Sequence, residues 1–261
     1  MWPEQAFEPR QPELVLKAPL VNTPGTLGFS PDIRSMPFLK YLGALITNPI
    51  SRLPRHPAND RCCLPFEGGF LLHTGLPNPG ISQVIRRFKR RWAEAPLPII
   101  PHLLAEDPSS LAEMVHKLES LENIAAVEIG LPPACTPGEL TAYFNAAAGE
   151  LPVIISLSPE QIGLLIESLL AQPPTAVHLT YSRGTLPGPD GQLISGRLYG
   201  PAVFPLITTG ATRLRSAGLH VIVSGGIDTR QKIDLFLSTG VLAVGMDTIL
   251  WGIKPEQFLT D

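Results

Sequence analysis

A glycine pair at the end of a late apolar segment has the clearest chemistry in this sequence. The β-branched run Val221–Val223 leads directly into Ser224, Gly225 and Gly226. Because glycine has no β carbon, backbone N–H groups there can approach an anion, and the N-terminus of a following helix adds a favourable dipole. In α/β barrels such a phosphate site lies on the loops after the seventh and eighth strands. The pattern therefore predicts a phosphorylated ligand.

A second loop of the same kind comes one strand later. The apolar run Val241–Met246 leads into Asp247 and Thr248, which open the next helical pattern. We expect backbone N–H groups of this loop to complete the anion site. The carboxylate of Asp247 should point away from it, or else the site should be empty. Two like charges a few ångströms apart repel by roughly 1 kcal/mol in water and by several times more when desolvated.

Short apolar segments at regular intervals would place these loops at the ends of strands. They show little polar alternation, as expected for parallel strands covered on both faces. The candidate strands are Leu20–Asn22, Ala44–Thr47, Ile99–Leu103, Val127–Ile129, Val153–Leu157, Val177–Thr180, Val221–Ser224 and Leu242–Gly245. The candidate helices are Ser82–Ala93, Pro108–Leu121, Pro137–Ala148, Pro159–Ala171, Pro201–Ala217 and Arg230–Ser238. This alternation predicts one α/β domain over residues 1–261, a (β/α)8 TIM barrel.

One connection does not fit the regular alternation. From Ser51 to Pro79 the sequence is loop-like, with the glycine pairs and prolines typical of turns. Long irregular segments in compact domains are usually lids or binding loops. We therefore expect residues 51–79 to cover the carboxyl-terminal mouth of the barrel, and Trp2–Leu16 to cover its opposite end.

Composition excludes several classes of protein. The net charge of −3 gives no general polyanion-binding surface, although Arg86–Arg91 forms a basic run, either a solvated helix face or a docking patch for an acidic partner. Three cysteines without a C-x-x-C pair favour neither a disulfide framework nor a metal site. The start of the chain is not a signal peptide, and no apolar run is long enough to span a membrane. We expect a cytoplasmic protein with a small-molecule substrate and no nucleic-acid or membrane partner.

Seven short motifs follow one another in barrel order. They are Leu20–Gly25, Gly43–Thr47, Gly75–Gly80, Val127–Ile129 with Pro137 and Gly138 in its loop, Ser195–Pro201, Ser224–Ile227, and Thr248. In this order the chain resembles the class 1 dihydroorotate dehydrogenases, from about Leu14 to Phe258. The resemblance implies an FMN-dependent flavoprotein of pyrimidine biosynthesis, an oxidoreductase acting on CH–CH groups, and it leaves a homodimer open.

The resemblance also implies positions for the site. The cofactor would be held by Pro24, Gly25, Thr47, Asn48, Ser156, Ser195, Gly196, Gly225, Gly226 and Thr248. The substrate would contact Leu76, Tyr181 and Ser182. Cys135 is the thiol nearest to the family's catalytic base, two residues further along the same loop, and is the candidate catalytic residue.

The departures from the family concern side-chain chemistry. Asn48 and Ser156 stand where the family has lysines that contact the flavin, and Pro133 stands where it has its catalytic cysteine or serine. Asp247 replaces a phosphate-loop glycine. The orotate-binding asparagines fall on Leu72, Gly130, Cys135 and Tyr181. A site that lacks these groups leaves orotate unpaired and without a base, so we expect an altered substrate and weak or no dihydroorotate activity.

Other titratable residues could supply replacement chemistry. Strand alternation puts Glu128 on the same inward face as Gly130, where it would need a partner such as Arg183 or Arg197 or would have a raised pKa. A purely structural ion pair is the alternative role. The same arginines, or backbone donors, would have to supply positive charge near the flavin. Three histidines could form an acid–base or metal site only if they lie close together: His73, His102 and His178. Otherwise they are structural residues whose rings are hydrogen-bonded.

Two functional hypotheses follow. The first is a divergent FMN-dependent oxidoreductase with an altered substrate. The second is a non-catalytic, flavin-free barrel that keeps a phosphate site or acts as a binding partner, and a phosphosugar isomerase or lyase on the same fold is a third alternative. The surviving backbone motifs favour the first hypothesis, and the lost lysines together with Asp247 favour the second.

Overall fold

A curled parallel sheet forms the centre of the molecule. The computed structural model describes residues 12–32 and 34–252. The sheet has the strand order β1-β13-β12-β9-β8-β7-β6, and every neighbouring pair in it is parallel. Its strands are β1 (Leu20–Asn22), β6 (His102–Leu104), β7 (Val127–Gly130), β8 (Val153–Leu157), β9 (Ala176–Leu179), β12 (Val221–Ser224) and β13 (Ala243–Met246).

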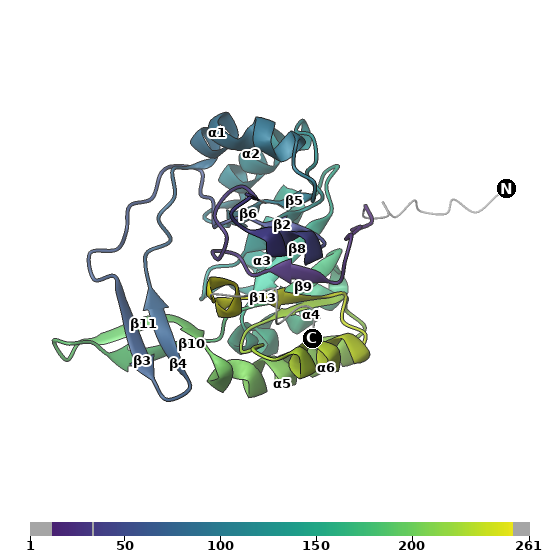
Figure 1. Ribbon diagram of the computed structural model, residues 1–261. Helices are drawn as coiled ribbons and strands as arrows, with labels where there is room; N and C mark the ends of the chain where they lie inside the picture. The colour runs from purple at the N-terminus through teal and green to yellow at the C-terminus, as the bar shows by residue number, and fades with distance from the viewer. Residues whose placement is uncertain (1–11, 33, 253–261) are drawn as a thin grey trace.

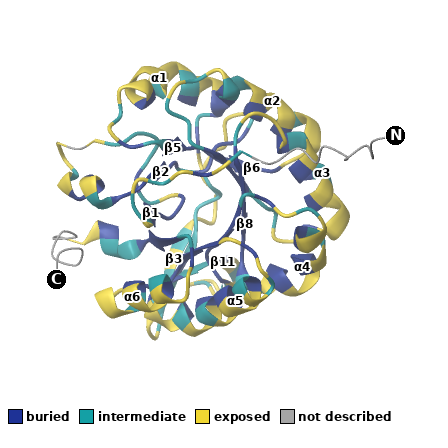
Figure 2. Cartoon of the chain, turned by 90° about the vertical axis from the view of Figure 1, so that its right-hand side faces the viewer, coloured by how far each residue is buried: buried dark blue, intermediate teal, exposed yellow. Residues whose placement is uncertain are grey.

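Two short strands and one side chain connect the two edges of this sheet. β2 (Leu45–Ile46) pairs in parallel with β5 (Ile99–Ile100), and only Pro101 separates β5 from β6. The predicted strand Ile99–Leu103 is therefore split, because proline has no N–H to donate to a ladder. Between β1 and β2, the side chain of Asn22 accepts from Ile46 N at 2.8 Å and donates to Ile46 O at 2.7 Å. The strands thus curve into an α/β barrel (Figure 2).

Helices surround the strands (Figure 2). They are α1 (Ile81–Ala93), α2 (Pro108–Glu119), α3 (Pro137–Ala147), α4 (Ile162–Ala171), α5 (Phe204–Ser216) and α6 (Arg230–Ser238). Short 3₁₀ turns precede α4 and α5 (Pro159–Gln161 and Pro201–Val203) and follow β1 and β13 (Pro37–Tyr41 and Thr248–Trp251). Polar caps define several starts, as at α3, where Thr136 and Glu139 bond reciprocally to each other's backbone N–H. No helix of the described residues is long and apolar enough to cross a membrane.

The barrel interior changes from apolar to polar along the strands. Near the amino-terminal ends, a layer of small and β-branched side chains fills the interior: Val21, Ala44, Ile46, Ile100, Ala126, Ile154, Ala176, Ile222 and Ala243. Leu14 and Leu16 pack against this layer, as predicted for the segment that closes this end, while residues 2–11 of that prediction lie outside the described residues. Two residues further along the strands come His102, Glu128, Ser156, His178 and Ser224, all at most 4% exposed.

The segment between Ser51 and Pro79 is not irregular throughout, and this prediction was partly wrong. It contains the hairpin β3 (Cys62–Phe66) and β4 (Gly69–His73). A second hairpin, β10 (Arg183–Pro187) and β11 (Leu193–Tyr199), pairs with it to give the antiparallel order β10-β11-β4-β3. Figure 1 shows this sheet projecting from one side of the barrel, with both hairpins side by side.

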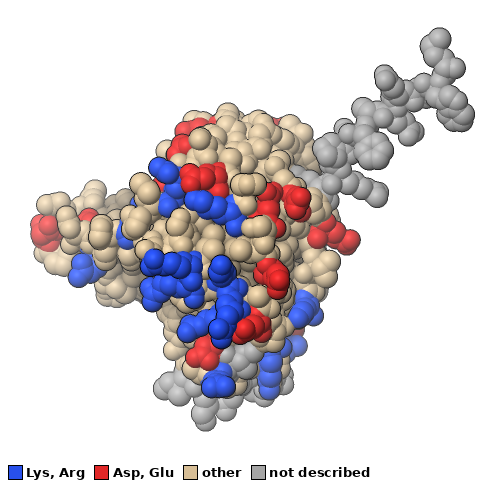
Figure 3. All heavy atoms as spheres, turned by 90° about the horizontal axis from the view of Figure 1, so that it is seen from above, with Lys and Arg blue, Asp and Glu red and all other residues tan. Residues whose placement is uncertain are grey.

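The basic run of the sequence lies on α1. Figure 3 shows Lys and Arg side chains gathered on the face that carries this helix, and its exposed members are Arg86, Arg87, Lys89, Arg90 and Arg91. The opposite face of α1 buries Ile81, Val84 and Trp92. The helix is therefore amphipathic with a solvated basic face, and a docking role for that face stays a prediction.

Candidate functional site

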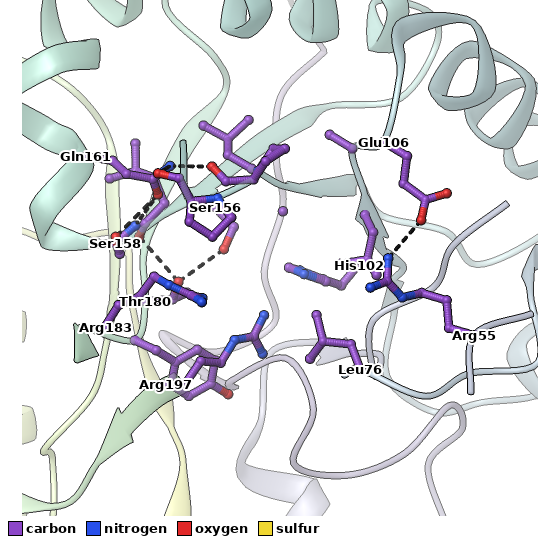
Figure 4. Close-up of a pocket in the computed structure, with 18 residues that line it drawn as sticks. Arg55, Leu76, His102, Glu106, Ser156, Ser158, Gln161, Thr180, Arg183 and Arg197 are labelled. Carbon is purple, nitrogen blue, oxygen red and sulfur yellow. Dashed lines mark hydrogen bonds and ion pairs between the residues drawn. The ribbon is translucent and has the colours of Figure 1, made fainter. Parts of the chain in front are cut away.

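A cavity of ≈ 220 Å³ opens at the carboxyl ends of four consecutive barrel strands, β6 to β9 (Figure 4). Its wall combines the ends of these strands with residues of both hairpin segments. The lining residues are Arg55, Leu76, His102, Leu104, Ala105, Glu106, Gly130, Leu131, Pro132, Pro133, Ser156, Leu157, Ser158, Gln161, Thr180, Tyr181, Arg183 and Arg197. Barrel enzymes place their active sites at this end of the strands.

Glu128 lies beneath the cavity and holds two histidines. Its Oε1 is 2.8 Å from Nδ1 of His102, and its Oε2 is 3.0 Å from Nδ1 of His178. All three residues are at most 2% exposed. Burial disfavours the charged carboxylate, but the two imidazoles outweigh that effect and lower the pKa of Glu128 to about 2. The prediction that Glu128 needs a partner is confirmed, with histidines in place of the expected Arg183 or Arg197.

The tautomer of His102 follows from this contact. An ionised carboxylate can only accept, so Nδ1 of His102 carries the proton that it donates to Glu128. Burial lowers the pKa of His102, more than the neighbouring carboxylate raises it, and this keeps the imidazole neutral. Its Nε2 then carries an unshared lone pair. That atom is buried and has no hydrogen-bond partner in the described residues. Backbone N–H of His102 donates to Thr47 Oγ1 at 3.1 Å, which fixes the strand beneath the ring.

His178 completes the buried network on its other side. Its Nε2 is 2.6 Å from the hydroxyl oxygen of Ser224. A β carbon on Gly245 would lie 1.8 Å from that oxygen, so this glycine makes room for the pair. Ser224, expected from the sequence as part of an anion loop, therefore belongs to the acid–base network. His73 does not converge on it, because its ring pairs with Asp60 in the first hairpin.

Two arginines reach into the cavity from the second hairpin. Arg183 and Arg197 are direct register partners across β10 and β11, and Figure 4 shows both side chains extending into the cavity opposite His102. Burial and the nearby positive charge of Arg197 lower the pKa of Arg183. The guanidinium of Arg197 lies 4.8 Å from the centre of the Tyr181 ring. A third arginine of the cavity, Arg55, is paired with Glu106 at 2.9 Å.

The phosphate loops hold an internal carboxylate. Asp247 is 2% exposed, and its Oδ1 accepts from the Thr248 N–H at 2.5 Å and from the Thr248 hydroxyl at 3.1 Å. Its other oxygen, Oδ2, is buried without a hydrogen-bond partner in the described residues. Burial raises the pKa of Asp247. The carboxylate therefore does not point away from this loop, which was the first of the two alternatives expected, because the Thr248 N–H predicted to hold a phosphate donates to it instead.

Ser195 and Gly196, which were also predicted to bind the phosphate, lie on the second hairpin and not on the phosphate loops. Both belong to β11, where the Ser195 hydroxyl bonds Thr185 across the hairpin at 2.7 Å. A β carbon on Gly196 would approach a Leu71 methyl carbon to 2.6 Å and the Leu72 carbonyl oxygen to 2.7 Å. Close packing against β4 thus accounts for this glycine, and neither residue lies beside Gly225, Gly226 or Thr248 in any described contact.

The remaining predicted cofactor positions make structural contacts, and among them only Ser156 lines the cavity. Asn48 accepts from the Gly28 N–H at 3.0 Å, and Thr47 supports His102. Ser156 bonds Thr180 at 3.3 Å. The Pro24 carbonyl accepts from the Tyr181 hydroxyl at 2.5 Å, and exposed Gly25 follows it with a φ of 94°.

Of the three predicted substrate residues, two line the cavity and one does not. Leu76 and Tyr181 line the cavity, and burial raises the pKa of Tyr181 well above its ordinary value. Ser182 is fully buried outside the lining and donates to Glu160 at 2.6 Å. Cys135 is 2% exposed, also outside the lining, and burial raises the pKa of its thiol to about 11. The geometry therefore gives no support to Cys135 as a base, because both proton affinity and access oppose it.

The sequence named Arg183 and Arg197 as candidate partners of Glu128 or of the flavin, but not as facing residues of one hairpin that line one cavity. Their contact depends on the pairing of β10 with β11, which no local pattern indicated. No group of three or more His, Cys, Asp and Glu side chains suitable for a metal ion occurs in the described part of the chain.

Comparisons with known proteins agree on one family. The catalytic subunit of dihydroorotate dehydrogenase B (NAD(+)) from Maridesulfovibrio salexigens is 27% identical over 90% of this chain and 84% of its own length. The same subunit from Streptococcus pneumoniae is 27% identical over 91% of this chain and 84% of its own length. No protein-family model matches the chain.

A solved structure extends the likeness to the fold. The dihydroorotate dehydrogenase of Eimeria tenella, crystallised with ferulenol, superimposes with a TM-score of 0.67 at 13% identity and covers 92% of this chain and 80% of its own. The resemblance read from the seven motifs is thus confirmed: in sequence and in fold, this chain is dihydroorotate dehydrogenase-like.

Proposed function

We propose that this chain is a divergent oxidoreductase of the dihydroorotate dehydrogenase type that acts on a substrate other than dihydroorotate. We further propose a single domain over residues 1–261 with a complete (β/α)8 barrel, in which the segment 51–79 lies over the carboxyl-terminal mouth. The relatives support the reaction class, since they are similar over about nine-tenths of the chain. A cytoplasmic location and a homodimer stay predictions.

One observation carries the proposal. The cavity at the strand ends contains four of the positions that the resemblance assigns to the substrate and the flavin ring: Leu76, Gly130, Ser156 and Tyr181. The site is therefore kept in place while its chemistry has changed. Orotate needs several hydrogen bonds, and these four side chains supply neither an amide nor an ammonium group. Rejection of a ligand whose polar groups stay unpaired is strong, so the substrate is expected to differ.

The flavin is supported by the relatives and not by the phosphate loops of this chain. FMN would need the N–H groups of Gly226 and Thr248, and the Thr248 N–H donates to the buried carboxylate of Asp247. A cavity of ≈ 220 Å³ is also smaller than the range of about 300–1,000 Å³ typical of small-molecule sites. As they stand, the described residues do not fit the cofactor. No step of the chemistry is therefore assigned to it here.

A flavin-free barrel is the second candidate, and Asp247 is the observation that favours it. Its carboxylate accepts from the N–H and the hydroxyl of Thr248, so an internal anion takes donors that a phosphate would need. The lost flavin-edge lysine, with Ser156 in its place, points in the same direction.

The visible absorption spectrum of the purified protein distinguishes the two candidates. A flavin spectrum, or saturable binding of added FMN, supports the oxidoreductase. Asp247→Gly should bind FMN more tightly than the natural chain, because it frees two donors and removes a like charge. Asp228→Asn is the matched control, since that carboxylate lies on the neighbouring loop, after β12, and is exposed and paired with Lys232. No FMN binding by either the natural chain or Asp247→Gly would establish the flavin-free barrel.

A further inference from the structure

We propose that the cavity binds a small carboxylate-bearing molecule through Arg183 and Arg197, and that Nε2 of His102 exchanges a proton with it. The proposal rests on the proposed function in one respect, namely that this cavity is the substrate site. A carboxylate is a group that dihydroorotate also carries; the residues that would bind it and the base that would act beside it are what neither the resemblance nor the relatives provide.

The arginine pair is the first argument. Arg183 and Arg197 lie directly opposite each other on antiparallel strands, an arrangement that is unfavourable for like charges. Neither guanidinium forms an ion pair with a carboxylate of the described residues. The nearest candidate, Glu160, accepts from the Ser182 hydroxyl and from the backbone N–H of Arg183. Two guanidinium groups that line one cavity, Arg197 against the Tyr181 ring and neither paired with a carboxylate among the described residues, suit a carboxylate ligand, since each can bind one through two N–H groups.

The unsatisfied nitrogen of His102 is the second argument, and it is independent of the first. This residue is 2% exposed and lines the cavity, and its Nε2 has no partner in the described residues. Buried polar atoms in folded proteins are nearly always paired, so an orphan atom beside a cavity indicates a missing ligand. A β carbon at position 130 would lie only 2.5 Å from Nε2. Gly130, also on the cavity wall, is therefore what keeps a side chain off this nitrogen.

Together these groups define one chemistry. The arginines hold the carboxylate, and Nε2 faces the rest of the bound molecule. A C–H bond next to a carbonyl or carboxylate group breaks as its proton moves to Nε2, and the electron pair is delocalised onto the substrate oxygens. Return of that proton reverses the step, so no oxidant is consumed. Glu128 is a positioning residue: it fixes the tautomer of His102 and stabilises the imidazolium that forms.

Calorimetry on flavin-free protein tests the anion site. The probes are succinate, 2-oxobutyrate and orotate, with uracil as the neutral counterpart of orotate. We expect succinate or 2-oxobutyrate to bind and uracil not to bind, and orotate to bind more weakly because its ring groups stay unpaired. Arg183→Gln and Arg197→Gln should each weaken binding about 10-fold or more, since a hydrogen bond to a charged group is lost. Arg55→Gln is the control, because that guanidinium already pairs with Glu106, and its effect should be smaller.

Imidazole nitrogen NMR tests the role of His102 in the same samples. In the free protein its Nε2 should resonate as an unprotonated nitrogen, and it should shift when the bound carboxylate arrives. Nε2 of His178 is the internal control, because Ser224 already occupies it. His102→Gln should remove the shifting resonance while the binding of the carboxylate persists through the arginines.

The outcomes separate the proposals from each other. Failure of all three carboxylates to bind, or equal binding by the arginine variants, overturns the anion site. Binding without any shift of the His102 nitrogen overturns its proton-exchange role. Neither result depends on flavin, so a colourless protein that binds carboxylates would refute only the oxidoreductase, and a yellow protein that binds none would refute only this inference.

Discussion

A buried carboxylate can remain charged inside a barrel when each of its oxygens accepts a hydrogen bond. Glu128 achieves this with one imidazole on each oxygen, at 2.8 and 3.0 Å. The sequence indicated that Glu128 faces inward and that His102 and His178 could converge, because strand alternation is local information. It could not indicate which partner Glu128 takes, since the two histidines lie 26 and 50 residues away. Only the lateral order of the strands brings them together.

Acid should therefore destabilise this protein through Glu128. Its folded-state pKa is depressed from 4.5 to about 2, so its contribution to stability is complete above pH 4.5 and is lost as the pH falls towards 2. His102 acts in the same direction: its lowered pKa means that the unfolded chain takes up a proton first, as the pH falls through 6.5. In urea unfolding experiments from pH 8 to pH 3, the free energy of unfolding should decrease steadily as the pH is lowered.

Glu128→Gln isolates the contribution of the carboxylate. Removing one member of a buried charge network typically costs about 3–5 kcal/mol, so the free energy of unfolding at pH 7 should fall by that order. The decline below pH 4.5 should become shallower in the variant. Glu113→Gln, which removes an exposed carboxylate on α2, is the control and should change little. An unchanged pH profile in Glu128→Gln would contradict the assignment.

Thiol reactivity tests the placement of Cys135. A pKa of about 11 in place of the ordinary 9.0 leaves about 100-fold less thiolate, the reactive form, and the side chain is 2% exposed. Cys63 is exposed on β3. With an aromatic disulfide reagent at pH 8, Cys63 should react quickly, whereas Cys135 should react only after unfolding. Equal rates for Cys63→Ala and Cys135→Ala proteins would show that Cys135 is accessible and would revive its catalytic role.

At the scale of elements, local signals predicted the barrel and missed the hairpins. The bounds of β1, β8, β12 and α6 agree with the prediction to the residue, because apolar runs and polar caps are contiguous in sequence. The hairpins β3–β4 and β10–β11 were missed since each gains its stability from the other, about 125 residues away at the pair Arg197–Leu72. Gly196 illustrates the consequence: it was interpreted as a phosphate-loop residue, and its contacts are with Leu71 and Leu72.

Gly196→Ala tests this structural interpretation. The new β carbon would lie 2.6 Å from a Leu71 methyl carbon and 2.7 Å from the Leu72 carbonyl oxygen. Overpacking of this kind costs about 1–3 kcal/mol, and we expect that loss in urea unfolding. Gly138→Ala, near the start of α3 with no atom within 4 Å of the new carbon, should be neutral or slightly stabilising. A loss of FMN affinity at full stability in Gly196→Ala would instead support the original phosphate assignment.

At the scale of the whole molecule, the chain has a fold like that of its structural neighbour, while replacement of the polar groups of the site is part of the proposal. Fold likeness survives at 13% identity because the interior layers need only side chains of suitable size and polarity. Function depends on fewer and more exacting positions. In this chain those positions carry a proline, a serine and a leucine, while Glu128, His102 and the two hairpin arginines form a different constellation nearby.

The whole-molecule prediction is that this protein does not oxidise dihydroorotate at a useful rate, even when FMN is bound. Pro133 occupies the position of the family's base and cannot accept a proton, and a positioned base contributes about 10²- to 10⁴-fold. Ser156 carries no charge to stabilise a reduced flavin, and the loss of one preorganised donor costs a further 10²- to 10³-fold by analogy with known sites. The assay is dihydroorotate with a dye acceptor, on FMN-reconstituted Asp247→Gly protein.

Protein variants in the dihydroorotate assay distinguish the possible bases if orotate is formed. Turnover near background, with flavin bound, supports an altered substrate. Robust orotate formation that is lost in His102→Gln but kept in Cys135→Ala would show that the base has moved to the barrel interior and that the substrate is unchanged. Formation lost in Cys135→Ala instead would require the buried thiol to reach the cavity, a movement of the loop after β7 that the bonds from Gln161 to the carbonyl oxygens of Pro132 and Pro133 oppose.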